Sequence, residues 1–220
     1  MVFTDQQLEE MKNEIISLLR STNRPGIENV IKYLTEQSDY FYAPSSVQYH
    51  SNMKGGLCFH SLCVLKAARK IHQNMLELAL PEKQSEKITD ESIIICCLLH
   101  DICKTNFYYP EEKFYKDNTN HWVKYGSYTI NDKKFPMGHG EKSTIMLLAL
   151  GLKLSAQEMC AIRFHMGLTD PGMYISQYTK SSMMEAINSI PLVYLLMLSD
   201  GFASFLMEQT VNHKLECILP

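Results

Sequence analysis

The stretch SIIICCLLHDICK, residues 92–104, decides how this chain is expected to fold. Its seven-residue apolar run leads directly into His100 and Asp101, and Lys104 follows one turn later. An ionised aspartate at the end of a buried helix is costly unless another group compensates its charge. A helix terminus or an arginine could do so. A divalent metal ion could do so as well, and it would need more ligands than this pair supplies.

The overall composition is that of a soluble globular protein. The 220 residues are enough for one sizeable core, and 45% of them are hydrophobic and 20% charged. The net charge of -3 gives no reason to expect strong binding to duplex nucleic acid, although it leaves room for a local basic pocket. The N-terminus lacks an apolar signal core, and Asp200 interrupts the longest apolar run near the C-terminus, so we expect no membrane segment.

The cysteines indicate the cellular compartment. The chain has seven, an odd number, and several lie in apolar helical patterns, as Cys96, Cys97 and Cys160 do. No CxxC pair with the spacing of a metal knuckle is present. Buried free thiols in a reducing environment fit this pattern best, which predicts a cytoplasmic protein.

Helical periodicity covers most of the chain. Thr4 is expected to cap a first helix, with Gln7 as its capping-box partner, and a second helix should follow the Pro-Gly break at residues 25–26. Further helices are expected in segments 57–80, 85–104, 138–152, 155–167 and 181–209. Residues 107–136 are rich in Tyr, Trp and Val and contain turn residues, which predicts a small β-hairpin.

These segments together predict an all-α fold with a small β-hairpin insert. The sequence contains no internal repeat and no low-complexity linker, so one mainly helical domain is the simplest interpretation. Residues 1–44 are interpreted as an N-terminal helical extension of a main domain over residues 45–220. We expect the two parts to form one compact unit.

Four further residues are, like the His-Asp pair, histidines or carboxylates within or at the ends of predicted helices. His60 lies early in a helix after two glycines, His139 lies between two glycines at a helix start, and His165 lies near the end of a helix. Asp200 interrupts an apolar helix just as Asp101 ends one. Two apolar helices that each carry a carboxylate are hard to attribute to chance.

The ordered set resembles the HD superfamily of metal-dependent phosphohydrolases over roughly residues 45–205. The stretch HDICK is similar to the family's His-Asp-x-x-Lys core, GGLCFHSLCV to its first histidine helix, and LSDGFAS to the helix with its last aspartate. GHGEKS and RFHMG are similar to the extra histidines of the two-metal branches. The resemblance implies an HD-domain helical bundle and hydrolysis of a phosphate ester.

The resemblance also implies a role for each position. The implied ligands are His60, His100, Asp101 and Asp200 for a first metal ion, and His139 and His165 with a bridging Asp101 for a second. Such mixed ligands accept Mn, Fe, Zn, Ni or Mg, and two ions would activate a hydroxide for attack at phosphorus. Lys104 is expected to act beside Asp101 in catalysis and to bind substrate phosphate, although it could equally be a solvated lysine. Arg163 is a further substrate-binding candidate.

Each ligand has an alternative interpretation that needs no metal. His60 could be a core histidine bonded to a carbonyl, and His139 could cap its helix. His165 could pair with Asp170. Asp200 could be the N-cap of a last helix.

The aromatic insert lies between the His-Asp pair and His139 in the sequence, so it should border the metal cleft. Its Tyr108, Tyr109, Trp122 and Tyr125 could stack on a nucleobase, or they could pack against the helices.

Three functions are compatible with the pattern. The leading one is a two-metal phosphohydrolase or phosphodiesterase that acts on a nucleotide or another phosphate ester. The others are an HD-fold di-iron oxygenase, which would use the same ligands, and a non-catalytic nucleotide-sensing module. The family's exoribonucleases usually carry an N-terminal oligonucleotide-binding barrel, whereas residues 1–45 are predicted to form helices. A small nucleotide is therefore at least as good a substrate candidate as single-stranded nucleic acid.

Overall fold

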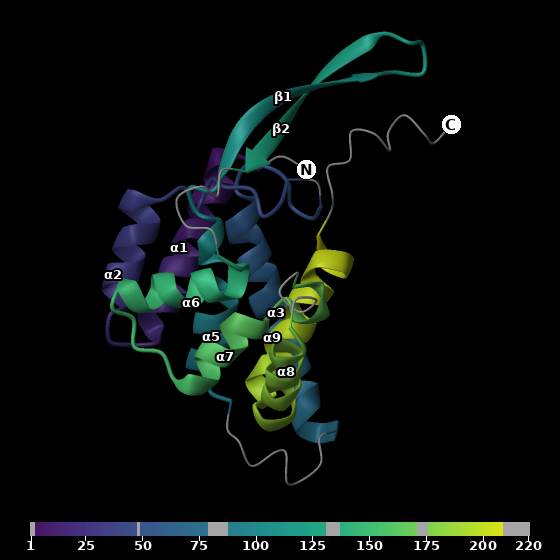
Figure 1. Cartoon of the computed structure of the whole chain (residues 1–220). Helices are drawn as coiled ribbons and strands as arrows, with labels where there is room; N and C mark the ends of the chain where they lie inside the picture. Colours follow the sequence, from purple (N-terminus) through teal and green to yellow (C-terminus); the bar gives the residue numbers. More distant parts are fainter. Residues whose placement is uncertain (1–2, 48, 79–87, 131–136, 171–175, 209–220) are drawn as a thin grey trace.

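The computed structural model describes residues 3–47, 49–78, 88–130, 137–170 and 176–208, and shows a helical body from which one hairpin projects (Figure 1). Its α-helices are α1 Asp5–Ser21, α2 Ile27–Lys32, α3 Gly56–Leu78, α5 Asp90–Leu99, α6 His139–Ala149, α7 Ala156–Phe164, α8 Gln177–Ser189 and α9 Pro191–Phe202. The predicted mainly helical chain with a small hairpin is confirmed. The predicted helix end at residues 80–81 lies outside the described residues.

Helix α5 forms the centre of the body. Every residue from Ile93 to Leu99 is buried, and the helix packs against α1, α3, α7 and α9. A helix that is apolar all round needs neighbours on every side, which explains why four helices surround it. Thr89 caps the start of α5 by accepting a hydrogen bond from the Ser92 N–H, so among the described residues the helix is shorter than the predicted segment 85–104.

The N-terminal helices belong to the same core. The predicted capping box of Thr4 and Gln7 is present at the start of α1, whose Ile15 and Leu19 are fully buried among residues of α5 and α9. Gly26 begins α2 with φ +89°, and a Cβ on it would lie 2.0 Å from the Gly151 oxygen. Only glycine allows this close approach between the α1–α2 turn and the end of α6.

The hairpin consists of β1 (Tyr108–Lys116) and β2 (Trp122–Ile130), which pair antiparallel. The register runs from the pair Tyr108 and Ile130 at the body to the pair Lys116 and Trp122 at the tip. Most of the hairpin stands clear of the helices (Figure 1), and Trp122 is 68% exposed. The hairpin base is therefore the part that adjoins the helical body.

The C-terminal segment differs from a single helical pattern. Helix α8 ends at Ser189 and α9 begins at Pro191, because proline favours the first turn of a new helix. A π-helical turn, η5 (Ala203–Met207), continues α9. In the described part of the chain no single helix is both long and apolar enough to cross a membrane. Helix α8 and the continuous segment of α9 and η5 meet that test only together, and they are bent by 103° at their break.

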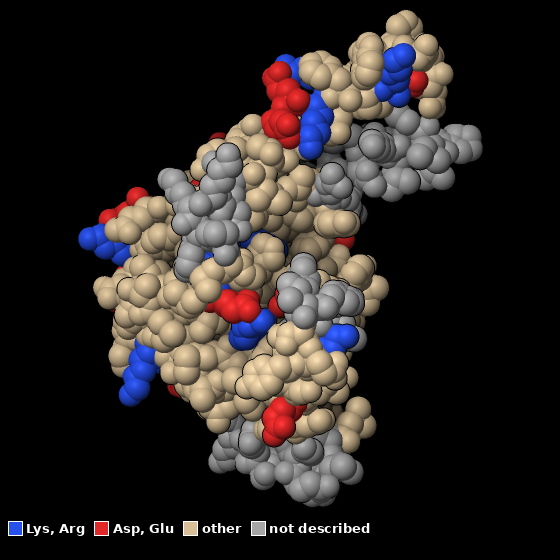
Figure 2. All heavy atoms as spheres, viewed as in Figure 1, with Lys and Arg blue, Asp and Glu red and all other residues tan. Residues whose placement is uncertain are grey.

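The surface charges are mixed rather than segregated. On the face drawn in Figure 2, Lys and Arg side chains lie in small groups, several of them beside Asp or Glu. The cysteines in the described residues are unpaired, and all but the half-buried Cys160 are buried, in agreement with the expected free thiols.

Candidate metal centre

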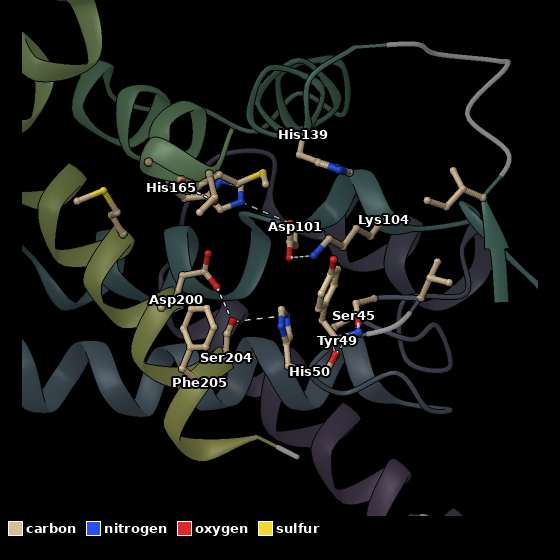
Figure 3. A pocket seen from close by; sticks show the side chains of 18 of the residues that line it. Ser45, Tyr49, His50, Asp101, Lys104, His139, His165, Asp200, Ser204 and Phe205 are labelled. Atoms are coloured by element: carbon tan, nitrogen blue, oxygen red, sulfur yellow. Dashed lines mark hydrogen bonds and ion pairs between the residues drawn. The ribbon is translucent and has the colours of Figure 1, made fainter. Parts of the chain in front are cut away.

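The candidate site forms where four packed helices bring their polar residues together. His60 comes from α3, His100 from the C-terminus of α5, His165 from the C-terminus of α7, and Asp200 from α9. Asp101 follows α5 directly, before the short 3-10 turn η2 (Ile102–Lys104). Figure 3 shows Asp101, His165 and Asp200 facing one cavity.

Two of the histidines are held in the same way at the ends of their helices. The Nδ1 atom of His100 lies 2.9 Å from the Cys97 carbonyl oxygen, and that of His165 lies 2.7 Å from the Ile162 carbonyl oxygen. A carbonyl oxygen can only accept, so each Nδ1 carries the proton. In its neutral form, such a ring presents the lone pair of Nε2, which is the arrangement of a metal-ligating histidine.

His60 is held by a carboxylate instead of a carbonyl. Its Nδ1 lies 2.7 Å from Glu208 Oε1, while its Nε2 lies 3.3 Å from Asp200 Oδ1 and 3.2 Å from His100 Nε2. Two imidazole nitrogens at this separation repel each other unless a cation lies with them, either a proton on one ring or a shared metal ion. The ring of His60 is fully buried.

Asp101 lies between the histidines and the lysine. Its Oδ2 accepts a hydrogen bond of 2.6 Å from Lys104 Nζ and lies 3.4 Å from His100 Nε2. Its Oδ1 is buried and has no hydrogen-bond donor among the described residues, and His165 Nε2 lies 3.5 Å from it. An unsatisfied carboxylate oxygen beside a lone-pair nitrogen is unfavourable by itself and is suited to a cation.

The ionisation states agree with a cation-binding cluster. Burial opposes charge on Asp101, but Lys104 and His100 outweigh it and hold the Asp101 pKa well below its usual range. Burial also opposes charge on Asp200, yet His60 keeps its pKa low. Burial disfavours protonated His60, whereas Asp200 and Glu208 raise its pKa to about 10. Two ionised carboxylates thus favour positive charge on or beside the buried histidine rings.

The ligand atoms fall into groups that could each hold a metal ion. His60, His100 and Asp200 form one group, and His100, Asp101 and His165 form another, with the atoms of each group within 4.8 Å of one another. The mixture of imidazole nitrogen and carboxylate oxygen suits divalent transition metals. The residues present therefore fit a divalent metal ion.

Two predicted site residues lie apart from these groups. His139 begins α6 and lines the same cavity, with its Nδ1 3.5 Å from Cys103 Sγ. Arg163 does not line the cavity, and its guanidinium pairs with Glu141 and, at 2.9 Å, with Asp170.

The structure also bears on the interpretations without metal. Asp200 lies within α9, which begins at Pro191 and continues past it, so it is not the N-cap of a later helix. His60 bonds to a carboxylate through Nδ1 and not to a carbonyl. Asp170 accepts from Arg163, and His165 lies beside Asp101.

The sequence reasoning missed Glu208 and His50. The Glu208 carboxylate bonds to Nδ1 of His60. The ring of His50 lies beside the ring of His60, with their centroids 4.9 Å apart. His50, His60 and Glu208 form a third group of metal-ligand type. His50 lies outside the apolar helical patterns. Glu208 directly follows Phe205, Leu206 and Met207 near the end of the predicted helix over residues 181–209, so its local context is similar to that of Asp101.

A cavity of about 1230 Å³ opens above the cluster. Asp101, Lys104, His139, His165 and Asp200 line it, together with His50 and Ser204 (Figure 3). Of the four aromatic residues predicted to border the cleft, Tyr108 lines this cavity, and Tyr109, Trp122 and Tyr125 are not among its lining residues. Burial raises the pKa of Tyr108 to about 12.

The comparisons with known proteins give one distant relative. The dihydroneopterin 2′,3′-cyclic phosphate phosphodiesterase of Methanocaldococcus jannaschii is 30% identical over 106 residues, which are 47% of this chain and 38% of that protein. The chain thus covers well under two thirds of that relative's length. No protein-family model matches the chain, and no solved structure matches it. The resemblance to the HD superfamily therefore rests on the motifs.

Proposed function

We propose that this protein is a metal-dependent phosphodiesterase of HD type that hydrolyses a nucleotide-like phosphate ester. The observation that carries the proposal is the buried cluster at the base of the cavity. There, Nε2 atoms of three histidines meet two carboxylates, and one Asp101 oxygen has no donor in the described chain. The distant relative named as a phosphodiesterase supports the same reaction class.

The chain would hold its metal ions through the residues of the predicted set. We assign His60, His100, Asp101 and Asp200 to one ion, and His165, Asp101 and His139 to a second. Bound divalent ions would supply Lewis acidity toward the phosphoryl oxygens and would lower the pKa of a water molecule. Glu208 would orient His60 through Nδ1, as carboxylates behind metal-ligating histidines commonly do.

Lys104 would act on the substrate side of the cluster. Its ammonium group lines the cavity and bonds to Asp101, which raises the Lys104 pKa despite burial and keeps the group positively charged. A fixed positive charge at this place can bind a phosphate oxygen or stabilise the charge that develops during ester cleavage.

The substrate would be a small ester rather than a long polymer. The relative's name states a 2′,3′-cyclic phosphate substrate, and a cyclic diester of this kind would fit the cavity here. A short single-stranded nucleic acid would reach the cluster only if its end entered the same cavity. We therefore propose small cyclic or linear nucleotide esters as the first compounds to test.

The test is metal-dependent hydrolysis by the purified protein. We expect Mn²⁺ to support cleavage of nucleoside 2′,3′-cyclic phosphates and a chelator to abolish it. His60→Ala should remove metal and activity, while the matched control His72→Ala, twelve residues further along α3, should keep both. Lys104→Ala should slow cleavage at least about tenfold, which corresponds to roughly 1.4 kcal/mol of barrier, with the metal content unchanged. Full activity without bound metal would contradict the proposal.

A further inference from the structure

The cavity has a second wall that the proposed chemistry does not use. Beside the polar cluster, thioether and aromatic side chains line the space, from the residue just before η3 (Gly167–Thr169), from α8, and from α9 with η5. These side chains are Met166, Met183, Met184, Met197 and Phe205. A phosphate group alone needs neither an apolar wall nor about 1230 Å³ of space, so this wall is suited to the organic part of a ligand.

The C-terminal helix presents this wall and the cluster side by side. Met197, Gly201 and Phe205 are four residues apart, so they follow one another along one face of the helix. Asp200 and Ser204 form the adjacent row, and their side chains bond to each other at 3.3 Å. Gly201 is thus the point where the apolar row passes beside a predicted metal ligand.

Gly201 has no structural reason to be a glycine. Its φ lies outside the left-handed region, and among the described residues no atom outside its own stretch of helix backbone lies within 4 Å of the position that a Cβ would take. A glycine within a helix is less stable than an alanine. Gly167 on the facing turn is different, because its φ of +53° lies in the left-handed region that favours glycine, and a Cβ there would also displace the Met197 side chain, whose Sδ would lie 2.5 Å away. The backbone therefore favours glycine at residue 167, whereas the described residues leave the space beside residue 201 open.

We propose that Gly201 is a specificity-determining residue that leaves room for a planar aromatic or heteroaromatic ring of the substrate, held against the methionine wall. The inference deepens the proposed function and rests on it for the phosphate end of the ligand. Thioether groups make favourable contacts with aromatic rings, and flexible methionines adapt to their shape. In this arrangement the aromatic ring of the substrate lies next to Asp200, and the phosphate group of the substrate lies over the histidine and carboxylate cluster.

The test compares two cyclic diesters with the same reacting ring. Adenosine 2′,3′-cyclic phosphate carries a base, whereas ethylene phosphate is the same five-membered diester without a nucleoside. The measured quantity is kcat/KM for adenosine 2′,3′-cyclic phosphate divided by kcat/KM for ethylene phosphate. We expect Gly201→Leu to lower this ratio at least about tenfold relative to the wild type, because the leucine fills the ring site. The difference in intrinsic reactivity between the diesters cancels in this comparison.

The matched control is Gly126→Leu on β2. In the part of the chain that the structure describes, no atom lies within 4 Å of a Cβ on Gly126 either, and Gly126 does not line the cavity, so its variant should keep the wild-type ratio. Metal content and Tm show whether each variant is folded and loaded. If Gly201→Leu fails either check, Gly201→Ala replaces it and should lower the ratio by a smaller factor. An unchanged ratio in a folded, metal-loaded variant at residue 201 would overturn the proposal.

A binding measurement separates this inference from the proposed function. If the wild type cleaves neither diester, the proposed phosphodiesterase function is contradicted. The ring site is then tested by calorimetry alone. Adenosine 2′-monophosphate should bind more tightly than 2-hydroxyethyl phosphate, and Gly201→Leu should remove most of that preference. Equal binding of the two monoesters by the wild type would overturn the ring site even if hydrolysis were observed.

Discussion

Each histidine of the cluster is oriented by a bond on the side away from the cavity. His100 and His165 use carbonyl oxygens of their own helices, and those acceptors exist wherever the helices end. His60 is different because it lies inside α3, where helix carbonyls are already bonded. It depends on Glu208, which comes from the far end of the chain.

This dependence gives a prediction for Glu208. The substitution Glu208→Gln keeps the shape of the side chain but removes the charge that supports His60. We expect metal affinity to fall by about 10–100-fold, measured by titration of the metal-free protein with Mn²⁺ or Zn²⁺. The control is Glu185→Gln on α8, whose carboxylate is exposed. Equal metal affinities in the wild type, Glu208→Gln and Glu185→Gln would show that Glu208 does not orient His60.

At the same scale, the residues that could be predicted are those placed in an unfavourable local context. Asp101 and Asp200 stand out because each follows or interrupts an apolar helix, where a carboxylate needs compensation. Glu208 also follows an apolar run, residues 205–207, whereas His50 lies in a polar, turn-rich stretch where no local signal marks it. Only the packing of η5 and the loop before α3 brings them to His60.

At the scale of elements, one buried carboxylate joins three parts of the chain. Glu158 completes the capping box of α7 with Ser155 and accepts a hydrogen bond of 2.7 Å from Ser92 of α5. It also accepts two bonds from the Arg24 guanidinium, at 2.7 and 2.8 Å, from the turn before α2. Glu158 is fully buried, and Arg24 is mostly so.

We therefore expect Glu158→Gln to lower the free energy of unfolding by about 2–3 kcal/mol at pH 7, less than for a fully buried pair because Arg24 is partly exposed. Burial raises the Glu158 pKa, but Arg24 and the Ser155 N–H outweigh it and the net pKa is lowered. The stabilisation is thus complete above the unfolded pKa of about 4.3 and is lost as the pH falls through the lower folded pKa.

Urea unfolding of the wild type and of Glu158→Gln between pH 7 and pH 3 checks this prediction. The difference in unfolding free energy should shrink below roughly pH 4. The control is Glu28→Gln, since Glu28 pairs with Arg20 at the surface, with both side chains more than half exposed, and its effect should be much smaller. A difference that stays constant down to pH 3 would show that the Glu158 charge is not what stabilises the native state.

Elements with local signals were predictable, and elements set by packing were not. The Thr4 capping box, the start of α5 at Thr89 and the hairpin all follow from residues within a few positions of each other. The break before Pro191 is also a local signal, which the apolar pattern on both sides obscured. The π-helical turn η5 has no such signal, and it lies where Glu208 must reach His60.

At the scale of the whole molecule, the N-terminal helices and the cluster-bearing helices share one core. Ile15 and Leu19 of α1 and Val30 of α2 belong to the same buried group as the apolar residues of α5 and α9. We therefore propose that residues 1–44 and 45–220 fold as one unit, with the first part bracing the helices that carry the ligands.

The whole-molecule question is which reaction the cluster serves. The same ligands could hold a di-iron centre that activates oxygen, and a sensing module could bind a nucleotide without turnover. Metal-assisted hydrolysis needs no change of oxidation state, so a redox-inert ion can support it. An oxygenase needs iron, an electron source and dioxygen. The two reactions therefore differ in what they require from the solution, even with identical ligands.

We expect hydrolysis of a nucleoside 2′,3′-cyclic phosphate to proceed at the same rate in air and under nitrogen, with Mn²⁺ as the added metal. Lys104→Ala separates turnover from binding, because a sensor that loses this lysine would lose ligand affinity but has no rate to lose. The measurement is product formation by chromatography on anaerobic and aerobic samples of one metal-loaded preparation. Turnover that requires iron and stops under nitrogen would assign the cluster to oxygen chemistry. Tight nucleotide binding without any product would assign it to sensing.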